Sequence, residues 1–376
     1  MQSIKDTCNT NIIVLITNEF LGDDNNSLGV ARALKELQQQ ATITQYKQND
    51  WSNISIDETQ NTIVIGAGEA TLETIADLKS KYRNKVFVSW SSHQLPEKKM
   101  QEMLDTIDLI NLPNGIITTF TERERFKGKL VETNGVPHNL SREDLKEAYE
   151  KAKVFLPEFN NDKKRILFVL GGDAPNVQTG QIQCFNDRDI EQVVKYITSL
   201  DQEKHQIFIV SSPRTGKYIL EVNKHTESAK LIENPTTHRS DKPITEPTDP
   251  VSMSLLKLLN DSKIDYSFYD FRYGEVSFFK ALLHCCSVAF IPGESTSMIS
   301  EAKDFTGVII YTNSAMSKSH TRFVEQISKT YGLKVLNGQI LEKSVECKPI
   351  STQTAAETVA NAIISSLEIS PSTPTF

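Results

Sequence analysis

The sequence predicts an α/β protein with two Rossmann-like domains facing a cleft. Short runs rich in β-branched residues are each followed by a turn and a helical apolar period, which is typical of parallel sheets. The alternation occurs twice, before residue 121 and after residue 160. A chain of 376 residues is also longer than one hydrophobic core usually serves. Ligands of such sheets bind at the carboxyl ends of the strands.

The first predicted domain covers residues 1–120. NIIVLIT (11–17) is typical of a buried strand, and SLGVARALKEL (27–37) of an amphipathic helix. The same pattern predicts further strands at TITQYK, TIVIGAG, KVFVSW, DLINLP (108–113) and GIITTF (115–120), with a helix at 70–82.

Residues 121–160 break this rhythm and are predicted to form a connector with one helix. Ser141 is a favourable N-cap for that helix, because acidic residues follow it in the first turn.

The second predicted domain covers residues 161–350 and repeats the alternation, beginning with the strand and loop of RILFVLGGD (165–173). Residues 231–250 hold four prolines and no apolar period, which predicts a loop. The C-terminal helix, predicted at 351–367, is expected to pack back on the first domain, and residues 368–376 form a tail.

Composition narrows the class of protein. The formal net charge of -7 argues against a nucleic-acid-binding chain. The five cysteines form no CxxC pair, which is typical of reduced thiols in a cytoplasmic protein. The N-terminal apolar run is too short for a signal peptide, and no segment is long enough to span a membrane. Any membrane contact is therefore expected to be peripheral.

Two glycine-rich turns follow predicted strands. Gly66 and Gly68 give GxG without the third glycine of a dinucleotide fingerprint. Gly171 and Gly172 would let the backbone approach a ligand closely. The alternative for both is a tight strand-to-helix turn.

The stretch PGEST (292–296) raises the question of a nucleophilic serine, because Gly293, Glu294 and Ser295 resemble the start of a hydrolase elbow. The only downstream histidine is His320, and a catalytic triad assembles in space rather than in sequence. A second interpretation is an anion site, in which the helix N-terminus and its hydroxyls hold a pyrophosphate. A third is that the hydroxyls only cap the helix, which Glu294 favours because a carboxylate repels phosphate. We expect caps that double as phosphate contacts at Ser295, Thr296 and Ser297.

Other candidates lie in neighbouring turns. Arg214, where a strand meets a helix start, suits a phosphate. Glu301 would accept hydrogen bonds from sugar hydroxyls. Asp23 and Asp24 follow the first strand and would provide a general base or cap the helix at 27–37. No His, Asp and Glu grouping has metal-ligand spacing, so neither a metal nor a cofactor is expected.

Several of these segments together resemble the mitochondrial-fission ELM (elongated mitochondria) family and its bacterial glycosyltransferase-like relatives. IGAGEAT (65–71) is similar to the family's IGAGRxT, and SSPRTG (211–216) to its SRRTP. Similar segments also occur at GVPHNLSREDL (135–145), LGGDAPN (170–176) and YGEVSFFKALLHCCSVAFIPGESTSMISEA (273–302).

The resemblance implies a GT-B-like fold whose second domain holds a nucleotide, and a link to mitochondrial division. Two positions depart from the family pattern. Asp23 stands where the family has a histidine, which changes the expected base to a carboxylate or signals lost catalysis. The family's arginine pair becomes Pro213 and Arg214.

The sequence therefore predicts a metal-independent transferase that moves a sugar from a nucleotide-diphosphate donor to an acceptor. Asp23 is the predicted base, and Gly66, Gly68 and Asn25 lie on the acceptor side. The predicted donor residues are Gly171, Gly172, Arg214, Ser295, Thr296, Ser297 and Glu301. The alternatives are a non-catalytic adaptor at a membrane surface and an esterase that uses Ser295.

Overall fold

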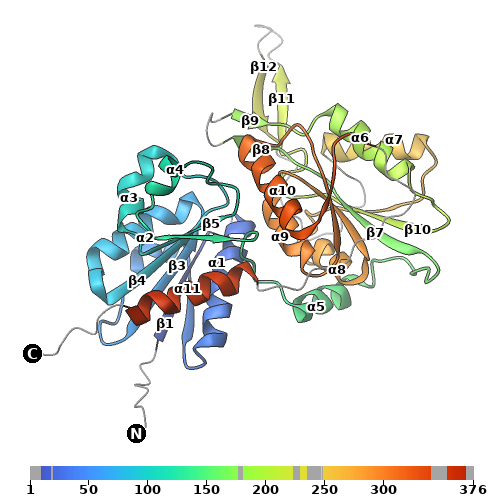
Figure 1. Cartoon of the computed structure of the whole chain (residues 1–376). Helices are drawn as coiled ribbons and strands as arrows, with labels where there is room; N and C mark the ends of the chain where they lie inside the picture. The colour runs from blue at the N-terminus through green and yellow to red at the C-terminus, as the bar shows by residue number, and fades with distance from the viewer. Residues whose placement is uncertain are drawn as a thin grey trace, which may run out of the picture. The chain divides into compact units, whose positions relative to one another are not determined.

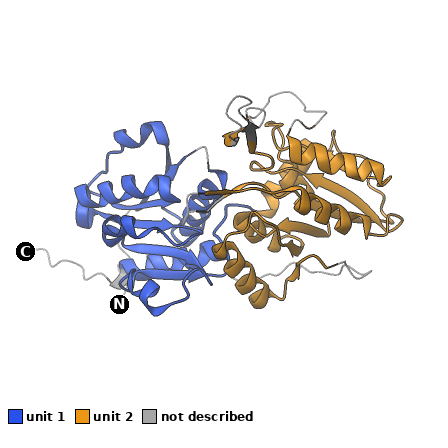
Figure 2. Cartoon of the chain, turned by 90° about the horizontal axis from the view of Figure 1, so that it is seen from above, with its two compact units in different colours: residues 1–140, 352–376 blue, residues 141–351 orange. Residues whose placement is uncertain are grey.

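The computed structural model describes residues 10–17, 20–176, 181–222, 229–234, 247, 249–339 and 354–369. The chain divides into two compact units (Figure 1, Figure 2), Met1–Leu140 with Thr352–Phe376 and Ser141–Ser351. The division lies inside the predicted connector. Each unit is built on a six-stranded parallel sheet. The predicted α/β class with two Rossmann-like domains is confirmed.

Unit 1 has the strand order β2-β1-β3-β4-β5-β6, and every neighbouring pair is parallel. The inner strands are buried at almost every residue, as strands covered on both faces are. The strands are β1 (Thr10–Ile16), β2 (Thr42–Lys47), β3 (Asn61–Ala67), β4 (Val86–Ser91), β5 (Leu109–Pro113) and β6 (Leu130–Thr133). The α-helices are α1 (Leu21–Leu37), α2 (Glu69–Tyr82), α3 (Gln101–Thr106), α4 (Phe120–Glu124) and α11 (Ala355–Ile369).

The C-terminal helix α11 belongs to unit 1 (Figure 1). Its Val359, Ala360 and Ile363 are buried in one core with Val30 and Leu34 of α1. The chain thus leaves unit 1 after α4 and β6 and returns to it at its end.

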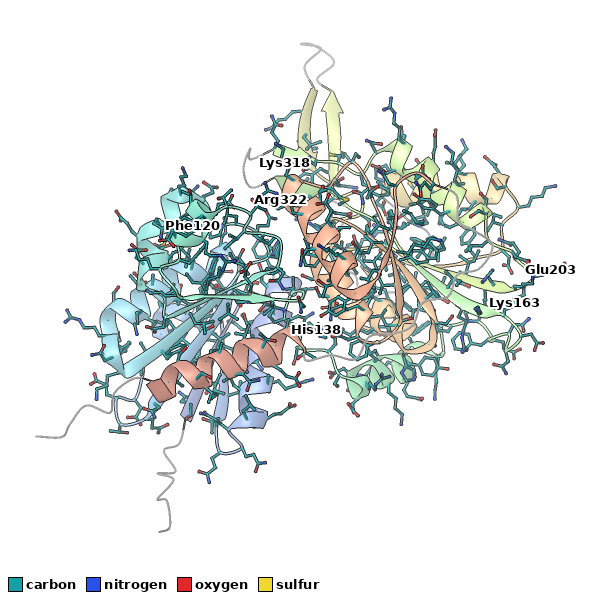
Figure 3. All side chains as sticks on the ribbon, in the orientation of Figure 1. Phe120, His138, Lys163, Glu203, Lys318 and Arg322 are labelled. Atoms are coloured by element: carbon teal, nitrogen blue, oxygen red, sulfur yellow. The ribbon has the colours of Figure 1, made fainter. Side chains whose placement is uncertain are left out.

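The segment after β5 differs from the sequence prediction. The prediction of a strand at 115–120 is wrong. The chain turns there, and α4 begins at Phe120. Phe120 is 76% exposed (Figure 3). The sixth strand is β6, in the predicted connector. The following loop packs on α1, since a Cβ on Gly29 would lie 2.3 Å from the carbonyl oxygen of His138. Residues up to 140 are therefore held to unit 1.

Unit 2 has the strand order β13-β10-β7-β14-β15-β16, again parallel throughout. Its sheet strands are β7 (Lys164–Val169), β10 (His205–Val210), β13 (Ser267–Tyr269), β14 (Val288–Pro292), β15 (Gly307–Tyr311) and β16 (Lys334–Leu336). The helices are α5 (Arg142–Ala152), α6 (Asp187–Thr198), α7 (Pro250–Asp261), α8 (Phe278–Cys285), α9 (Thr296–Lys303) and α10 (Lys318–Tyr331).

Two antiparallel hairpins extend from unit 2 beyond β7 and β10. They are β8 (Ala174–Asn176) with β9 (Gln181–Gln183), and β11 (Tyr218–Val222) with β12 (Ala229–Glu233). The loop predicted at 231–250 therefore begins as a strand, and its residues 235–246 and 248 lie outside the described residues. The predicted tail lies almost entirely outside them as well.

Candidate functional site

Strand order singles out one place in each sheet. In unit 2 the chain builds β7, β10 and β13 in one direction and then returns to place β14 on the other side of β7. In unit 1 the same reversal separates β1 from β3. Loops on either side of such a switch point diverge and leave a crevice at the carboxyl ends of the strands, where α/β proteins bind ligands. Four predicted site residues, Gly68, Gly171, Gly172 and Ser295, lie in the loops at these two points, and the others lie in adjoining helices or strands or in the loop after β10.

In unit 2 the loops after β7 and β14 are joined through Glu294. The Gly172 N–H donates to Glu294 Oε1 at 2.8 Å, and the Asn313 side-chain amide donates to Oε2. Glu294 is only 1% exposed, and this burial raises the pKa of its carboxyl, although the Arg214 charge opposes the rise. The carboxylate therefore points into the protein. Its presence in PGEST is no longer an argument against a phosphate at the helix N-terminus.

Arg214 brings a positive charge to the start of α9. Its Nη2 donates to the Glu294 carbonyl oxygen at 3.2 Å and lies 3.4 Å from Ser295 Oγ. The turn that carries it is fixed by Thr215, whose hydroxyl donates to the Gly171 carbonyl at 3.0 Å. The structure thus brings together Gly171, Gly172, Arg214 and Ser295, which the sequence predicted from separate turns.

Helix α9 begins at this cluster. Ser295 occupies the N-cap position, but its side chain makes no capping hydrogen bond to the residues that the structure describes. The predicted cap at Ser295 is therefore wrong. By contrast, α6 and α10 are capped by the side chains of Asn186 and Ser317. An N-terminus without a side-chain cap presents N–H groups and the positive end of the helix dipole to an anion.

The remaining predicted donor residues lie on α9 itself. Thr296 is buried, Ser297 is half-buried, and Glu301 is only 5% exposed. Of the three, Ser297 has the side chain most accessible to a ligand.

Gly172 sits where no side chain fits. A Cβ there would lie 2.3 Å from the carbonyl carbon of Arg214, a backbone atom that cannot move cheaply. Gly172→Ala is therefore expected to lower the free energy of unfolding by about 1–3 kcal/mol. Urea denaturation measures the change, and a midpoint equal to that of the wild type would contradict the close approach.

In unit 1 helix α1 begins earlier than predicted, at Leu21 rather than residue 27. Asp24 lies in its first turns, and its Oδ1 accepts from the Thr17 N–H at 2.7 Å and from the Thr17 hydroxyl at 2.9 Å. Asp24 is therefore hydrogen-bonded to the end of β1 and has a structural role. Asn25, predicted on the acceptor side, lies half-buried in the same turns of α1.

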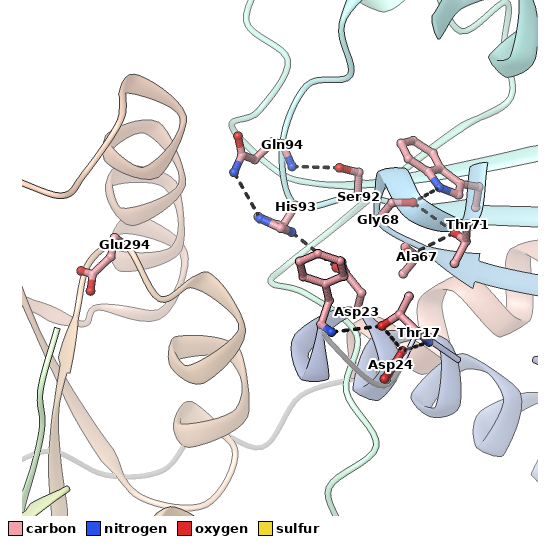
Figure 4. Close-up of polar contacts among 12 residues, drawn as sticks. Thr17, Asp23, Asp24, Ala67, Gly68, Thr71, Ser92, His93, Gln94 and Glu294 are labelled. Carbon is pink, nitrogen blue, oxygen red and sulfur yellow. Dashed lines mark hydrogen bonds and ion pairs between the residues drawn. The ribbon is translucent and has the colours of Figure 1, made fainter. Parts of the chain in front are cut away.

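Asp23 faces the loop that follows β4 (Figure 4). Its Oδ1 lies 3.7 Å from Nδ1 of His93, and the Gln94 side-chain amide lies 3.3 Å from the other ring nitrogen of His93. The other Asp23 oxygen rests over Gly68, where a Cβ would be 2.1 Å away. Gly68 also has φ of 76°, in the region that favours glycine.

Gly66 has a packing role. A Cβ there would lie 2.5 Å from the Ile75 side chain and 2.8 Å from the Thr71 hydroxyl, both on α2. The close approach of β3 to α2 accounts for this glycine without a ligand.

Sequence reasoning missed His93 and Asn313. Both follow strands directly, in the loops after β4 and β15. The signal that marks both is a polar side chain just beyond a buried strand, as at Asp23 and Arg214. The contacts of Ser295 and His320 do not support the esterase alternative. Ser295 Oγ contacts Arg214, whereas His320 Nδ1 accepts a hydrogen bond from the Ser317 N–H at 3.0 Å.

Two further observations concern only the part of the chain that the structure describes. No helix there is long and apolar enough to cross a membrane. No three His, Cys, Asp or Glu side chains there are grouped so as to hold a metal ion.

Several solved structures are remotely similar to the whole chain. A putative UDP-N-acetylglucosamine 2-epimerase from Listeria monocytogenes is 10% identical, with 96% of this chain and 88% of that one covered and a TM-score of 0.46. MurG from Acinetobacter baumannii is 9% identical, with 96% and 91% covered and a TM-score of 0.42. MnaA of S. aureus, solved with UDP, is 12% identical, with 96% and 88% covered and a TM-score of 0.42.

A sequence comparison with curated proteins finds no match. The family model described as "Mitochondrial fission ELM1" matches residues 22–245, which include the Asp23 turn, both glycine-rich turns and Arg214. This match covers more than half of the chain. The chain therefore belongs to the mitochondrial fission ELM1 family.

Proposed function

We propose that this protein is a GT-B-type transferase that binds a nucleotide-diphosphate sugar at the switch point of unit 2. The observation that carries the proposal is Arg214 beside the N-terminus of α9, which has no side-chain cap from Ser295. A guanidinium and a helix N-terminus in one place suit a diphosphate, which carries negative charge on several oxygens. The proposed donor residues are Gly171, Gly172, Arg214, Ser295, Thr296, Ser297 and Glu301.

The same groups would serve the chemical step. As the bond between the sugar and the diphosphate breaks, negative charge builds on the leaving oxygen. Arg214 and the first N–H groups of α9 would stabilise this charge more than that of the bound donor, which is how such groups accelerate a reaction. The positive charge comes from the protein, so we infer that the reaction needs no metal ion. Ser297 would bind a phosphate oxygen, and Glu301 a sugar hydroxyl.

Isothermal titration calorimetry with UDP, GDP and CMP sugars tests the donor site. At least one nucleotide is expected to bind, and Arg214→Ala is expected to weaken its binding about 10- to 100-fold, because a charge-assisted hydrogen bond is lost. Lys329→Ala is the matched control, since it removes an exposed positive charge from the last turn of α10. No binding by any nucleotide at millimolar concentration would overturn the proposal, as would equal affinities in the two variants.

A non-catalytic adaptor is the second candidate, favoured by membership of a mitochondrial fission family. Unit 1 exposes large apolar side chains at Phe20, Leu21 and Phe120, which suits contact with a partner or a membrane surface. Recovery of a dynamin-like partner in a pull-down, unchanged by Arg214→Ala and Ser297→Ala, would favour the adaptor. Nucleotide-dependent turnover that these substitutions abolish would favour the transferase.

A further inference from the structure

A cavity of about 310 Å³ lies in unit 2, where it is lined by the starts of α6 and α7 and by the bases of the two hairpins (Figure 1). The described residues that line it include none of the proposed donor residues. Pockets that bind small molecules have volumes from about 300 Å³ upward. The cavity is therefore large enough for one small ligand, and it belongs to a single unit.

Apolar side chains form much of the cavity wall. Phe185 and Ile190 are 4% and 3% exposed, and Val251 is buried as well. Tyr218, in β11, is half-buried and adds a second aromatic ring. The Phe185 ring packs closely on the loop after β7, because a Cβ on Gly171 would lie 2.4 Å from it. Such a wall suits a ligand with an apolar ring.

A buried carboxylate fixes the position of this wall. Asp173 Oδ1 accepts from the Phe185 N–H and Oδ2 from the Tyr218 N–H, both at 2.9 Å. The Cys184 thiol donates to the same carboxylate. Burial raises the pKa of the Asp173 carboxyl, although these hydrogen bonds and the Arg214 charge oppose the rise. Asp173 thus joins the bases of both hairpins, so the wall is formed without a ligand.

The charged groups that line the cavity are acidic. Asp187, the first residue of α6, lines it and is exposed, and Asp173 lies deeper. The described residues that line it include no Lys, Arg or His. Lys217, the chain neighbour of Tyr218, is paired with Glu233 at 3.4 Å. An anion would therefore meet like charges in the cavity, whereas a cation would find a partner.

The helix N-termini beside the cavity do not reverse this preference. The Asn186 side chain caps α6 and accepts from the N–H groups of Arg188 and Asp189. The Asp249 carboxylate caps α7 and accepts from the Ser252 N–H at 2.8 Å. These caps occupy N–H groups that an anion would otherwise use, in contrast to the start of α9.

We propose that this cavity binds a small aromatic amine. The ring of the ligand packs against Phe185 and Tyr218, and its ammonium group pairs with the Asp187 carboxylate. This inference goes beyond the proposed function, since it requires neither a nucleotide nor unit 1. An amine with about nine non-hydrogen atoms is expected to bind with a Kd of roughly 1 mM.

Cys184 serves as the reporter of occupancy, because it lines the cavity and is half-buried. The probe is phenethylamine, and its control is phenylacetate, which has a similar size and the opposite charge. The full chain is labelled with iodoacetamide, and mass spectrometry of its peptides follows each thiol. Phenethylamine at about 20 mM is expected to slow the labelling of Cys184 about tenfold or more. Phenylacetate at the same concentration is expected to leave that rate unchanged. Cys285, a half-buried thiol of α8 that does not line the cavity, is expected to react at the same rate throughout.

Two variants test the carboxylate. Asp187→Asn is expected to raise the Kd of phenethylamine about two- to fivefold, because an exposed ion pair contributes little. The control is Glu203→Gln, which removes an exposed carboxylate from the turn before β10 (Figure 3), at the other end of the sheet. This variant is expected to bind phenethylamine as the wild type does.

Each contrary outcome overturns the proposal. Labelling of Cys184 that phenethylamine leaves unchanged would show that the cavity does not bind the amine. Equal protection by phenethylamine and phenylacetate would show that charge does not select the ligand, as would an unchanged Kd in Asp187→Asn. Slower labelling of Cys285 along with Cys184 would mean a general effect on the protein rather than a site. Since the test contains no nucleotide, its failure is distinguishable from a failure of the proposed function.

Discussion

Asp270→Ala is expected to lower the free energy of unfolding by about 3–5 kcal/mol, because it breaks a buried ion pair and leaves a buried guanidinium without this carboxylate. Asp270 and Arg272 follow β13, and their side chains are 1% and 2% exposed. Asp270 Oδ1 accepts from the Arg272 backbone N–H at 3.0 Å and from Nε at 2.7 Å, and Oδ2 pairs with Nη2.

The positions of the tryptophans allow the change to be localised. Both of them, Trp51 and Trp90, lie in unit 1, whereas the ion pair lies in unit 2. In urea denaturation, far-UV circular dichroism is expected to show an earlier transition than tryptophan fluorescence. Lys153→Ala is the control, since its pair with Glu150 is about half exposed on both sides and such pairs contribute little. An unchanged circular-dichroism transition in Asp270→Ala would contradict the buried pair.

A double variant separates the lost charge pair from a distorted turn. Asp270→Asn with Arg272→Leu keeps an oxygen for the backbone N–H of residue 272 and removes both charges. Replacing a buried pair with residues of similar volume is often neutral. The double variant is therefore expected to regain most of the stability that Asp270→Ala loses.

The strands were predictable because both faces of a parallel strand are buried, which requires an unbroken apolar run. The run 11–17 gave β1 almost to the residue. The start of α1 was not predictable, because Gly22 and the polar residues after it are poor helix formers. Tertiary contacts override that preference, since Asp24 binds the end of β1 through Thr17. The edge strand β6 is short and only partly buried, so it has little apolar pattern to find.

The candidate sites were predictable to the extent that they lie in loops at the ends of buried strands. This rule gave Gly172, Arg214 and Ser295, which meet in the structure. It could not pair Asp23 with His93, because that contact depends on the order of the strands in the sheet. The family resemblance places an imidazole at position 23, whereas the structure provides one from a different loop. The direction of a side chain could not be predicted from the sequence either. The Glu294 carboxylate, for example, points into the protein.

Glu294→Ala is expected to lower the free energy of unfolding by about 3 kcal/mol, because the Gly172 N–H and the Asn313 amide lose their buried acceptor. The two loops that this carboxylate joins carry the proposed diphosphate site, so nucleotide binding is expected to weaken as well. Glu294→Gln keeps one acceptor oxygen and the side-chain volume, and is expected to retain binding. Calorimetry and urea denaturation of the two variants test the pair of expectations.

The pH dependence of stability isolates the charge of Glu294. Burial raises the pKa of this carboxyl in the folded protein, with Arg214 opposing the rise. The folded state then binds the proton more tightly than the unfolded state does, so this contribution to stability is complete below the unfolded pKa and is lost as the pH rises through the folded pKa. Glu294→Gln has no proton to lose, so its stability relative to the wild type is expected to increase from about pH 4 upward. Parallel stability curves in urea titrations from pH 4 to 8 would contradict the raised pKa. A stability difference that grows with pH would mean that the PGEST turn holds a carboxylate at a cost in stability, in order to join the two loops at the proposed phosphate site.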